Sequence, residues 1–190
     1  LASTGNAKSK EAICLENLLQ QKIAGLIIEP TQSARENGHL EYYRELEARG
    51  IPYLMLHAYY PELEPAYIIM DDEKGGYLVT QHMIELGHRR IAGIFKADDL
   101  QGLKRRAGYL KALAEYGIEP RPELIGAYET EELYSYPYQF TRHLLKQTPP
   151  PTGMVCYNDQ VALFALEALR EEGVKVPEDF SLISFDDSSL

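Results

Sequence analysis

The sequence has no long hydrophobic run and only two cysteines among its 190 residues. No apolar stretch approaches the roughly 20 residues that a transmembrane helix needs, so we expect no membrane span. Cys14 and Cys156 form no CxxC pair, and no histidine cluster accompanies them. We therefore expect two buried free thiols in a reducing cytoplasm, and neither a disulfide framework nor a metal site.

Positive charge is scarce as well. The chain carries 19 Lys and Arg residues against 29 Asp and Glu residues, which gives a formal net charge of −10. Neutralisation of phosphates by basic side chains dominates the affinity of proteins for nucleic acid, and the longest basic run, residues 104–106, is short. The chain is not expected to bind DNA by itself, so a DNA-binding role would require another domain.

The sequence motifs of common nucleotide-binding enzymes and hydrolases are missing. There is no GxGxxG turn, no phosphate-binding P-loop and no nucleophile elbow. We therefore predict no catalytic residue, no cofactor and no metal ion, and expect a binding protein that is not an enzyme.

Short apolar runs alternate regularly with amphipathic segments along the chain. Helical spacing of apolar residues predicts helices at 10–21, 40–49, 74–86, 103–116, 138–146 and 160–172. Continuous apolar runs predict buried strands at 23–28, 51–56, 90–95, 153–157 and 180–185. This alternation predicts an α/β fold whose parallel sheets are covered by helices on both faces. Residues 1–4 resemble a further strand without a preceding partner, so we expect the chain to be a fragment.

Polar residues follow most of the predicted strands. In open parallel sheets, ligands bind beyond the carboxyl ends of the strands. This rule selects six candidate binding residues: Glu29, His57, Lys96, Asn158, Asp159 and Asp186.

Four blocks of the sequence resemble those of LacI/GalR-type regulators, in that family's order and at about its spacing. They are Glu-Leu-Gly-His-Arg-Arg-Ile-Ala at 85–92, Arg-Arg-Ala-Gly-Tyr at 105–109, the run 151–159 that ends in Asn-Asp, and the run 176–187 from Val-Pro-Glu-Asp to Asp-Asp. Asp71-Asp72 resembles the Asp-Asn pair that opens a helix in the family. Each block is weak alone, but together they form a strong signal.

The resemblance implies a periplasmic-binding-protein-like fold, in which two doubly wound parallel-sheet lobes are joined by crossover strands and a small ligand binds between them. It places a partial N-terminal lobe at residues 1–59, a C-terminal lobe at 60–187 and the start of a return crossover at 188–190. It also implies a cytoplasmic homodimer that contacts operator DNA through a domain absent from this chain.

A sugar would suit the candidate residues, because its vicinal hydroxyls both donate and accept hydrogen bonds and so match Arg, Asp and Asn side chains. Arg105 matches an effector-contacting position because it lies three residues before Gly108. Asn158 and Asp159 match the family's Asn-Asp pair, and Asp186 matches its strand-end aspartate. The alternatives are a surface arginine at 105, a helix N-cap at Asp159 and a solvated turn carboxylate at Asp186. Capping and ligand contact are compatible if Asn158 and Asp159 divide these two roles.

Two further candidates depart from the family's pattern. His57 stands where the family usually has aspartate, and it could either contact the ligand or face solvent at a hinge. Lys96 stands where the family often has glycine, and it could reach a ligand hydroxyl or pair with Asp98 or Asp99.

The chain has fourteen tyrosines. Related proteins place an aromatic ring against the sugar in the region of Tyr128, Tyr134, Tyr136 and Tyr138, and the sequence does not choose among these four. His88 lies in the Gly-His turn of the family, which is structural, so we do not expect it to be catalytic.

The runs 5–11 and 57–61 resemble the arabinose-responsive members of the family most. We therefore expect the effector domain of a transcriptional repressor that senses a monosaccharide, L-arabinose in particular, and releases operator DNA when the sugar binds. The alternative is a solute-binding receptor for sugar uptake with the same fold, although the blocks at 87–90 and 176–179 resemble regulators more.

Overall fold

The computed structural model describes residues 1–189, and the chain divides into two compact units. The first unit comprises Leu1–Met70 and Asp98–Gln101, and the second comprises Asp71–Ala97 and Gly102–Leu190. This division differs from the boundary after residue 59 that was expected. Strand β3 (Ala66–Ile68) pairs with strand β2 (Tyr53–Leu56), so the chain stays in the first unit beyond that point.

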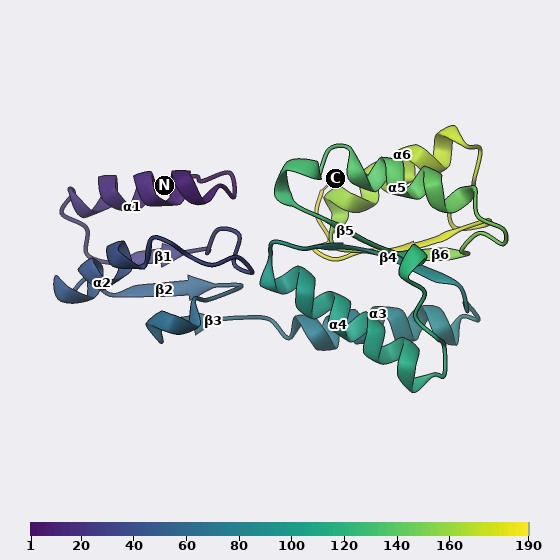
Figure 1. Ribbon diagram of the computed structural model, residues 1–190, viewed down its shortest axis with the longest axis horizontal. Helices are drawn as coiled ribbons and strands as arrows, with labels where there is room; N and C mark the ends of the chain where they lie inside the picture. Colours follow the sequence, from purple (N-terminus) through teal and green to yellow (C-terminus); the bar gives the residue numbers. More distant parts are fainter. Residues whose placement is uncertain (190) are drawn as a thin grey trace. The chain divides into compact units, whose positions relative to one another are not determined.

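The first unit is a parallel sheet with helices packed against one face. Strands β1 (Leu26–Ile28), β2 and β3 lie in that order, and helices α1 (Lys8–Leu19) and α2 (Leu40–Ala48) accompany them (Figure 1). Leu15 of α1, Leu46 of α2 and Met55 of β2 belong to one buried cluster. Ile27 and Ile68 remain 72% and 61% exposed.

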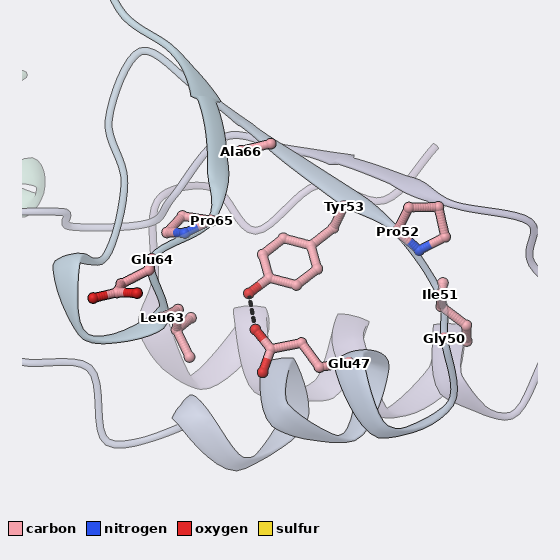
Figure 2. Close-up of a pocket in the computed structure, with 9 residues that line it drawn as sticks. All are labelled: Glu47, Gly50, Ile51, Pro52, Tyr53, Leu63, Glu64, Pro65 and Ala66. Carbon is pink, nitrogen blue, oxygen red and sulfur yellow. Dashed lines mark hydrogen bonds between the residues drawn. The ribbon is translucent and has the colours of Figure 1, made fainter.

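A shallow depression of about 400 Å³ lies at the amino ends of β2 and β3. Figure 2 shows the Tyr53 hydroxyl pointing at Glu47, to which it donates a hydrogen bond of 2.7 Å. Pro52 and Pro65 form part of the apolar wall. None of the ligand-binding residues predicted from the sequence lines this depression.

The second unit is a four-stranded parallel sheet covered on both faces. Its strands are β4 (Ile91–Lys96), β5 (Ile125–Tyr128), β6 (Gly153–Cys156) and β7 (Ser181–Ile183), in the order β5-β4-β6-β7. Helices α3 (Asp72–Glu85) and α4 (Leu100–Glu115) cover one face, and α5 (Tyr136–Leu145) and α6 (Asp159–Glu171) cover the other (Figure 1). The expected fold class, an α/β protein with parallel sheets, is confirmed.

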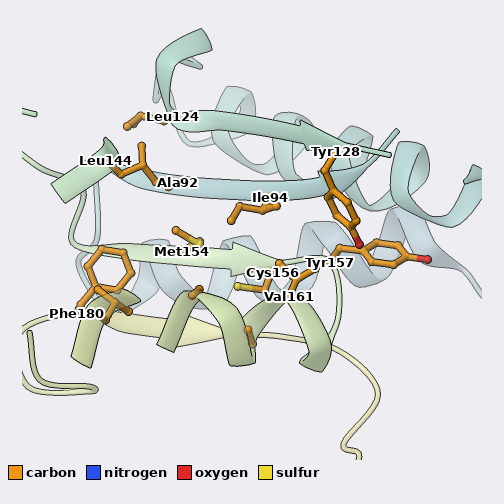
Figure 3. Packing of buried hydrophobic residues seen from close by; sticks show 13 residues of the cluster. Ala92, Ile94, Leu124, Tyr128, Leu144, Met154, Cys156, Tyr157, Val161 and Phe180 are labelled. Atoms are coloured by element: carbon orange, nitrogen blue, oxygen red, sulfur yellow. The ribbon is translucent and has the colours of Figure 1, made fainter. Parts of the chain in front are cut away.

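Side chains of β4 alternate between two cores. Ala92 and Ile94 join the cluster beneath α5 and α6, together with Met154 of β6 (Figure 3). Ile91 and Phe95 join the cluster beneath α3 and α4. A strand that is buried on both faces needs apolar residues at every position, which is why these strands appear as unbroken apolar runs.

Sequence periodicity missed two strands. Strand β3 is a three-residue run with exposed side chains, and β5 contains Gly126, where an added Cβ would lie only 2.9 Å from the Phe140 ring. Residues 1–4, which resemble a strand in sequence, form none.

The two thiols differ in their surroundings. Cys14 is only partly buried, which corrects the expectation for this residue, whereas Cys156 is fully buried. Burial raises the pKa of the Cys156 thiol to about 12. In the described part of the chain, no helix is long and apolar enough to span a bilayer.

Helices α3 and α4 approach each other through glycine. A Cβ added to Gly108 would lie 1.9 Å from the Glu73 carbonyl oxygen and 2.6 Å from the Tyr77 nitrogen, both backbone atoms. We expect Gly108→Ala to lower the free energy of unfolding by about 1–3 kcal/mol, because the backbones of α3 and α4 must move apart to make room for the new Cβ. The gain in helix propensity, about 1 kcal/mol, does not offset this cost.

Urea unfolding monitored by circular dichroism measures the effect. Gly38→Ala is the matched control, because an added Cβ there meets nothing within 4 Å. The control should change the free energy of unfolding by no more than about 0.5 kcal/mol. Equal stability of the two variants would contradict the close approach of α3 and α4.

Candidate functional site

The order of strands in the second unit creates a switch point between β4 and β6. The chain passes from β4 to β5 on one side, and its next strand, β6, lies on the other side of β4. Ligands of such sheets bind outside the carboxyl ends of the strands at this point. Lys96 ends β4, and Asn158 and Asp159 follow β6, so three of the predicted residues lie at this edge.

Arg105 of α4 reaches the same edge. Its Nε donates a 2.9 Å hydrogen bond to Asp72 Oδ1, and its Nη1 donates a 2.6 Å hydrogen bond to the carbonyl oxygen of Tyr157. Arg105 is 3% exposed and Asp72 is 4% exposed, so their ion pair is buried. The alternative of a surface arginine is therefore wrong.

Two aromatic rings lie against the Arg105 guanidinium. Its Cζ atom is 4.2 Å from the ring centre of Phe185 and 5.0 Å from that of Tyr157. Cation–π contacts of this kind orient the guanidinium and partly replace its hydration. The two hydrogen bonds to Asp72 and Tyr157 account for two of the five N–H groups that a guanidinium carries.

Asn158 is the N-cap of α6. Its backbone is extended, and its Oδ1 atom accepts a 3.1 Å hydrogen bond from the Val161 N–H. The capping interpretation is thus confirmed for Asn158, and Asp159 is the first residue of the helix. Because capping uses only the oxygen of the amide, the Nδ2 group remains a potential donor to a ligand.

Asp159 is tied to the segment that leaves β7. Its Oδ1 accepts a hydrogen bond from the Ser184 hydroxyl, and its Oδ2 accepts a 2.7 Å hydrogen bond from the Ser188 N–H. These donors, Ser184 first, hold the pKa of the Asp159 carboxyl below its usual value. The group is therefore an anion at neutral pH, and it can accept hydrogen bonds but not donate them.

The remaining candidates in the second unit differ in exposure. Asp186 is exposed and has a φ of 99°, next to Asp187 with a φ of 50°, so the chain turns sharply there. Lys96 is half-buried at the end of β4. The ligand roles of Asp186 and Lys96 remain predictions.

His57 belongs to the first unit, where it follows β2 in a left-handed conformation with a φ of 66°. Its Nδ1 atom is 3.1 Å from Oε1 of Glu29, which follows β1. The two strand-end residues thus contact each other, with side chains 46% and 69% exposed. The ligand role of His57 also remains a prediction.

Of the four candidate tyrosines, Tyr128 lies at the carboxyl edge of the second sheet. It is buried at the end of β5, and its ring is 6.3 Å from that of Tyr157 in an edge-on arrangement. Tyr134 packs on Phe164, Tyr136 stacks on Phe140, and Tyr138 donates to Glu171.

His88 precedes β4 at the opposite, amino edge of the sheet. Its Nδ1 atom lies 2.8 Å from the Thr152 hydroxyl oxygen, and its backbone N–H donates to the Met83 carbonyl at the end of α3. These contacts agree with a structural role in the turn.

Comparison with known protein families identifies the family of this chain. Residues 80–190, more than half of its length, match the family of periplasmic binding protein-like domains. The chain belongs to this family.

Curated relatives include bacterial repressors. The chain is 47% identical, over 99% of its length, to the arabinose metabolism transcriptional repressor of Halalkalibacterium halodurans. It is 44% identical, over 98% of its length, to the repressor of the same name from Geobacillus stearothermophilus. It spans 50% and 52% of these two proteins, about half of their length.

The fold is shared with a solved transcription regulator. The crystal structure of CcpA from Lactococcus lactis superimposes with a TM-score of 0.82 at 28% identity, over 99% of this chain and 66% of that one. The resemblance to LacI/GalR-type regulators is confirmed, and the relatives described are regulators, not enzymes.

Sequence reasoning did not assign a role in the site to Asp72, Tyr157, Ser184 or Phe185. Each lies inside a block that resembles the family, so the signal was present. The side-chain contacts of Asp72 and Phe185 with Arg105, and of Ser184 with Asp159, depend on packing between distant segments, which a sequence pattern does not reveal.

The hydrogen bond from Ser184 predicts a pH effect. Ser184→Ala removes the main donor to Asp159, so we expect the pKa of this carboxyl to rise towards the usual value of about 3.9. Because the folded-state pKa of Asp159 lies below the unfolded one, its contribution to stability is present above about pH 4 and is lost as the pH falls through the folded pKa. Titration of the Asp159 carboxyl ¹³C resonance measures the shift.

Ser189→Ala, at an exposed serine of the same segment, is the control and should leave the pKa of Asp159 unchanged. An unchanged titration in Ser184→Ala would show that the hydroxyl does not stabilise the carboxylate.

Proposed function

We propose that this chain is the effector-binding region of a transcriptional repressor and that its ligand is a neutral monosaccharide, L-arabinose in particular. The observation that carries the proposal is the arrangement at the switch point of the second unit. Arg105 is oriented there by Asp72 and Tyr157, next to the Asn158 amide and the Asp159 carboxylate. Such a set offers donors and acceptors together, as vicinal hydroxyls require.

The charge of the site favours a neutral ligand over a phosphorylated one. The positive charge of Arg105 is already balanced by Asp72 at 2.9 Å. Asp159 is ionised, and Asp186, three residues after β7, adds another carboxylate. Carboxylates therefore outnumber the cations Arg105 and Lys96, and an anionic ligand would meet repulsion.

Arabinose as the sugar is supported by the names of the two curated relatives. In our proposal, the two compact units are the two lobes of the effector domain, and a homodimer in the cytoplasm contacts operator DNA through a domain outside this chain. By linkage, the sugar weakens operator binding only as far as it binds the released state more tightly.

Thermal unfolding of the full-length protein against a panel of sugars tests the ligand. The panel contains L-arabinose, D-xylose, D-galactose, D-ribose and glucose 6-phosphate, with D-arabinose as the stereochemical control. A ligand at 100 times its dissociation constant should stabilise the folded state by about 2.7 kcal/mol. A shift with L-arabinose and none with D-arabinose is expected, whereas a shift with glucose 6-phosphate alone would contradict the neutral ligand.

A gel-shift assay with operator DNA tests the regulatory part. L-arabinose is expected to weaken the complex of the full-length protein with DNA, and D-arabinose is the control. Sugar binding without any effect on DNA binding would contradict the repressor mechanism and favour a solute-binding receptor.

The two roles assigned to Asn158 can be separated by one substitution. Asn158→Asp keeps an N-cap oxygen for the Val161 N–H but replaces the amide donor by a carboxylate. We expect stability without ligand to stay within about 0.5 kcal/mol of the original, because Asn and Asp cap equally well. Affinity for L-arabinose, measured by calorimetry, should fall at least about tenfold, the loss of one hydrogen bond to a ligand.

Asn158→Ala is the companion variant. It removes the cap as well and should lower stability by about 1 kcal/mol. Full sugar affinity in Asn158→Asp would confine Asn158 to its capping role.

A further inference from the structure

Phe185 contacts both the buried arginine and the start of α3. Its ring centre is 4.2 Å from Cζ of Arg105. A Cβ added to Gly75 would lie 3.1 Å from Cε1 of the same ring, so Phe185 packs directly on the first turn of α3. The ring thus occupies a defined place between the Gly75 backbone and the guanidinium.

Besides Phe185, the Arg105 guanidinium contacts the Tyr157 ring, 5.0 Å from Cζ, and two hydrogen-bond acceptors. Nε and Nη1 are each held by one hydrogen bond, to Asp72 and to the Tyr157 carbonyl. Two hydrogen bonds leave the planar group able to tilt, and of the two rings the Phe185 ring lies closer to Cζ than the Tyr157 ring does. An aromatic face against the planar cation opposes that tilt, because the attraction is strongest when the cation lies over the ring.

The neighbours of Phe185 belong to the same site. The preceding residue, Ser184, donates to Asp159, and the following residue, Asp186, is itself a predicted ligand contact with a φ of 99°. Three consecutive residues after β7 thus meet Asp159, Arg105 and the carboxyl edge of the sheet. A change in the backbone path of these three residues would therefore alter the contacts of both Asp159 and Arg105.

We propose that Phe185 is a positioning residue for sugar binding, because its ring fixes the plane in which the Arg105 guanidinium meets the bound sugar. This inference rests on the proposed function and extends it to a residue that does not touch the ligand. A purely structural role for Phe185 would affect stability alone, whereas a positioning role affects affinity.

Two variants of the full-length protein separate these roles. Phe185→Leu keeps an apolar side chain but removes the aromatic face, and Phe185→Tyr keeps the face. By calorimetry with L-arabinose, we expect Phe185→Leu to lose roughly tenfold in affinity, within the range of one cation–π contact, and Phe185→Tyr to retain the original affinity. Equal affinities of the original protein and Phe185→Leu would overturn the proposal.

Phe180→Leu is the matched control. Phe180 precedes the same strand and is 2% exposed, but it packs in the core beneath α5 and α6, away from the guanidinium. We expect it to lower the melting temperature and to leave sugar affinity unchanged. A similar loss of affinity in Phe180→Leu would mean that the effect reflects general destabilisation, and the proposal would fall.

A measurement without ligand distinguishes failure of this inference from failure of the proposed function. The Nε–H resonance of Arg105 in ¹⁵N-labelled protein reports the ring current of Phe185 and the bond to Asp72. The chemical shift of this resonance should change in Phe185→Leu and remain the same in Phe180→Leu. If the original protein binds none of the sugars, the proposed function fails. In that case, an unchanged Arg105 resonance in Phe185→Leu overturns the positioning of Arg105 by Phe185. A changed resonance supports it.

Discussion

The buried ion pair between Arg105 and Asp72 is the interaction on which the candidate site depends. Taking two charges out of water costs several kcal/mol per ion, so the pair persists only while both partners stay in hydrogen-bonding contact. Asp72 begins α3 and Arg105 lies in α4, so the pair requires the two helices to lie close together. Gly76 and Gly108 allow this approach, since a Cβ at Gly76 would lie 2.1 Å from the Arg105 carbonyl oxygen.

The parallel sheet brings the partners of this pair to one edge. All four strands of the second unit point the same way, so the residues that follow β4, β6 and β7 meet at the carboxyl edge. Arg105 bonds to the Tyr157 carbonyl after β6, and Ser184 after β7 bonds to Asp159 at the start of α6. Two helices and two strand ends are thus joined in one polar network around the switch point.

The neighbouring residues Asn158 and Asp159 have different partners in this network. Asn158 satisfies the helix terminus, while Asp159 binds the segment leaving β7 and keeps its negative charge. In the function proposed above, a sugar hydroxyl would share the Asp159 carboxylate with Ser184 and Ser188. Asp159 thus links the start of α6 to the segment that follows β7.

Apolar periodicity alone determined the α/β class, the positions of most helices and strands, and the strand-end residues Lys96, Asn158 and Asp159. These features are local, because burial on both faces of a strand or on one face of a helix imposes its own spacing on the chain. The family's blocks pointed to Arg105 but not to its surroundings. Only the tertiary structure decided that Arg105 is buried, that Asp72 and Phe185 hold it, and that Ser184 meets Asp159. Those contacts join residues 25 to 80 positions apart, and their formation depends on how closely packed helices and strand ends fit in space.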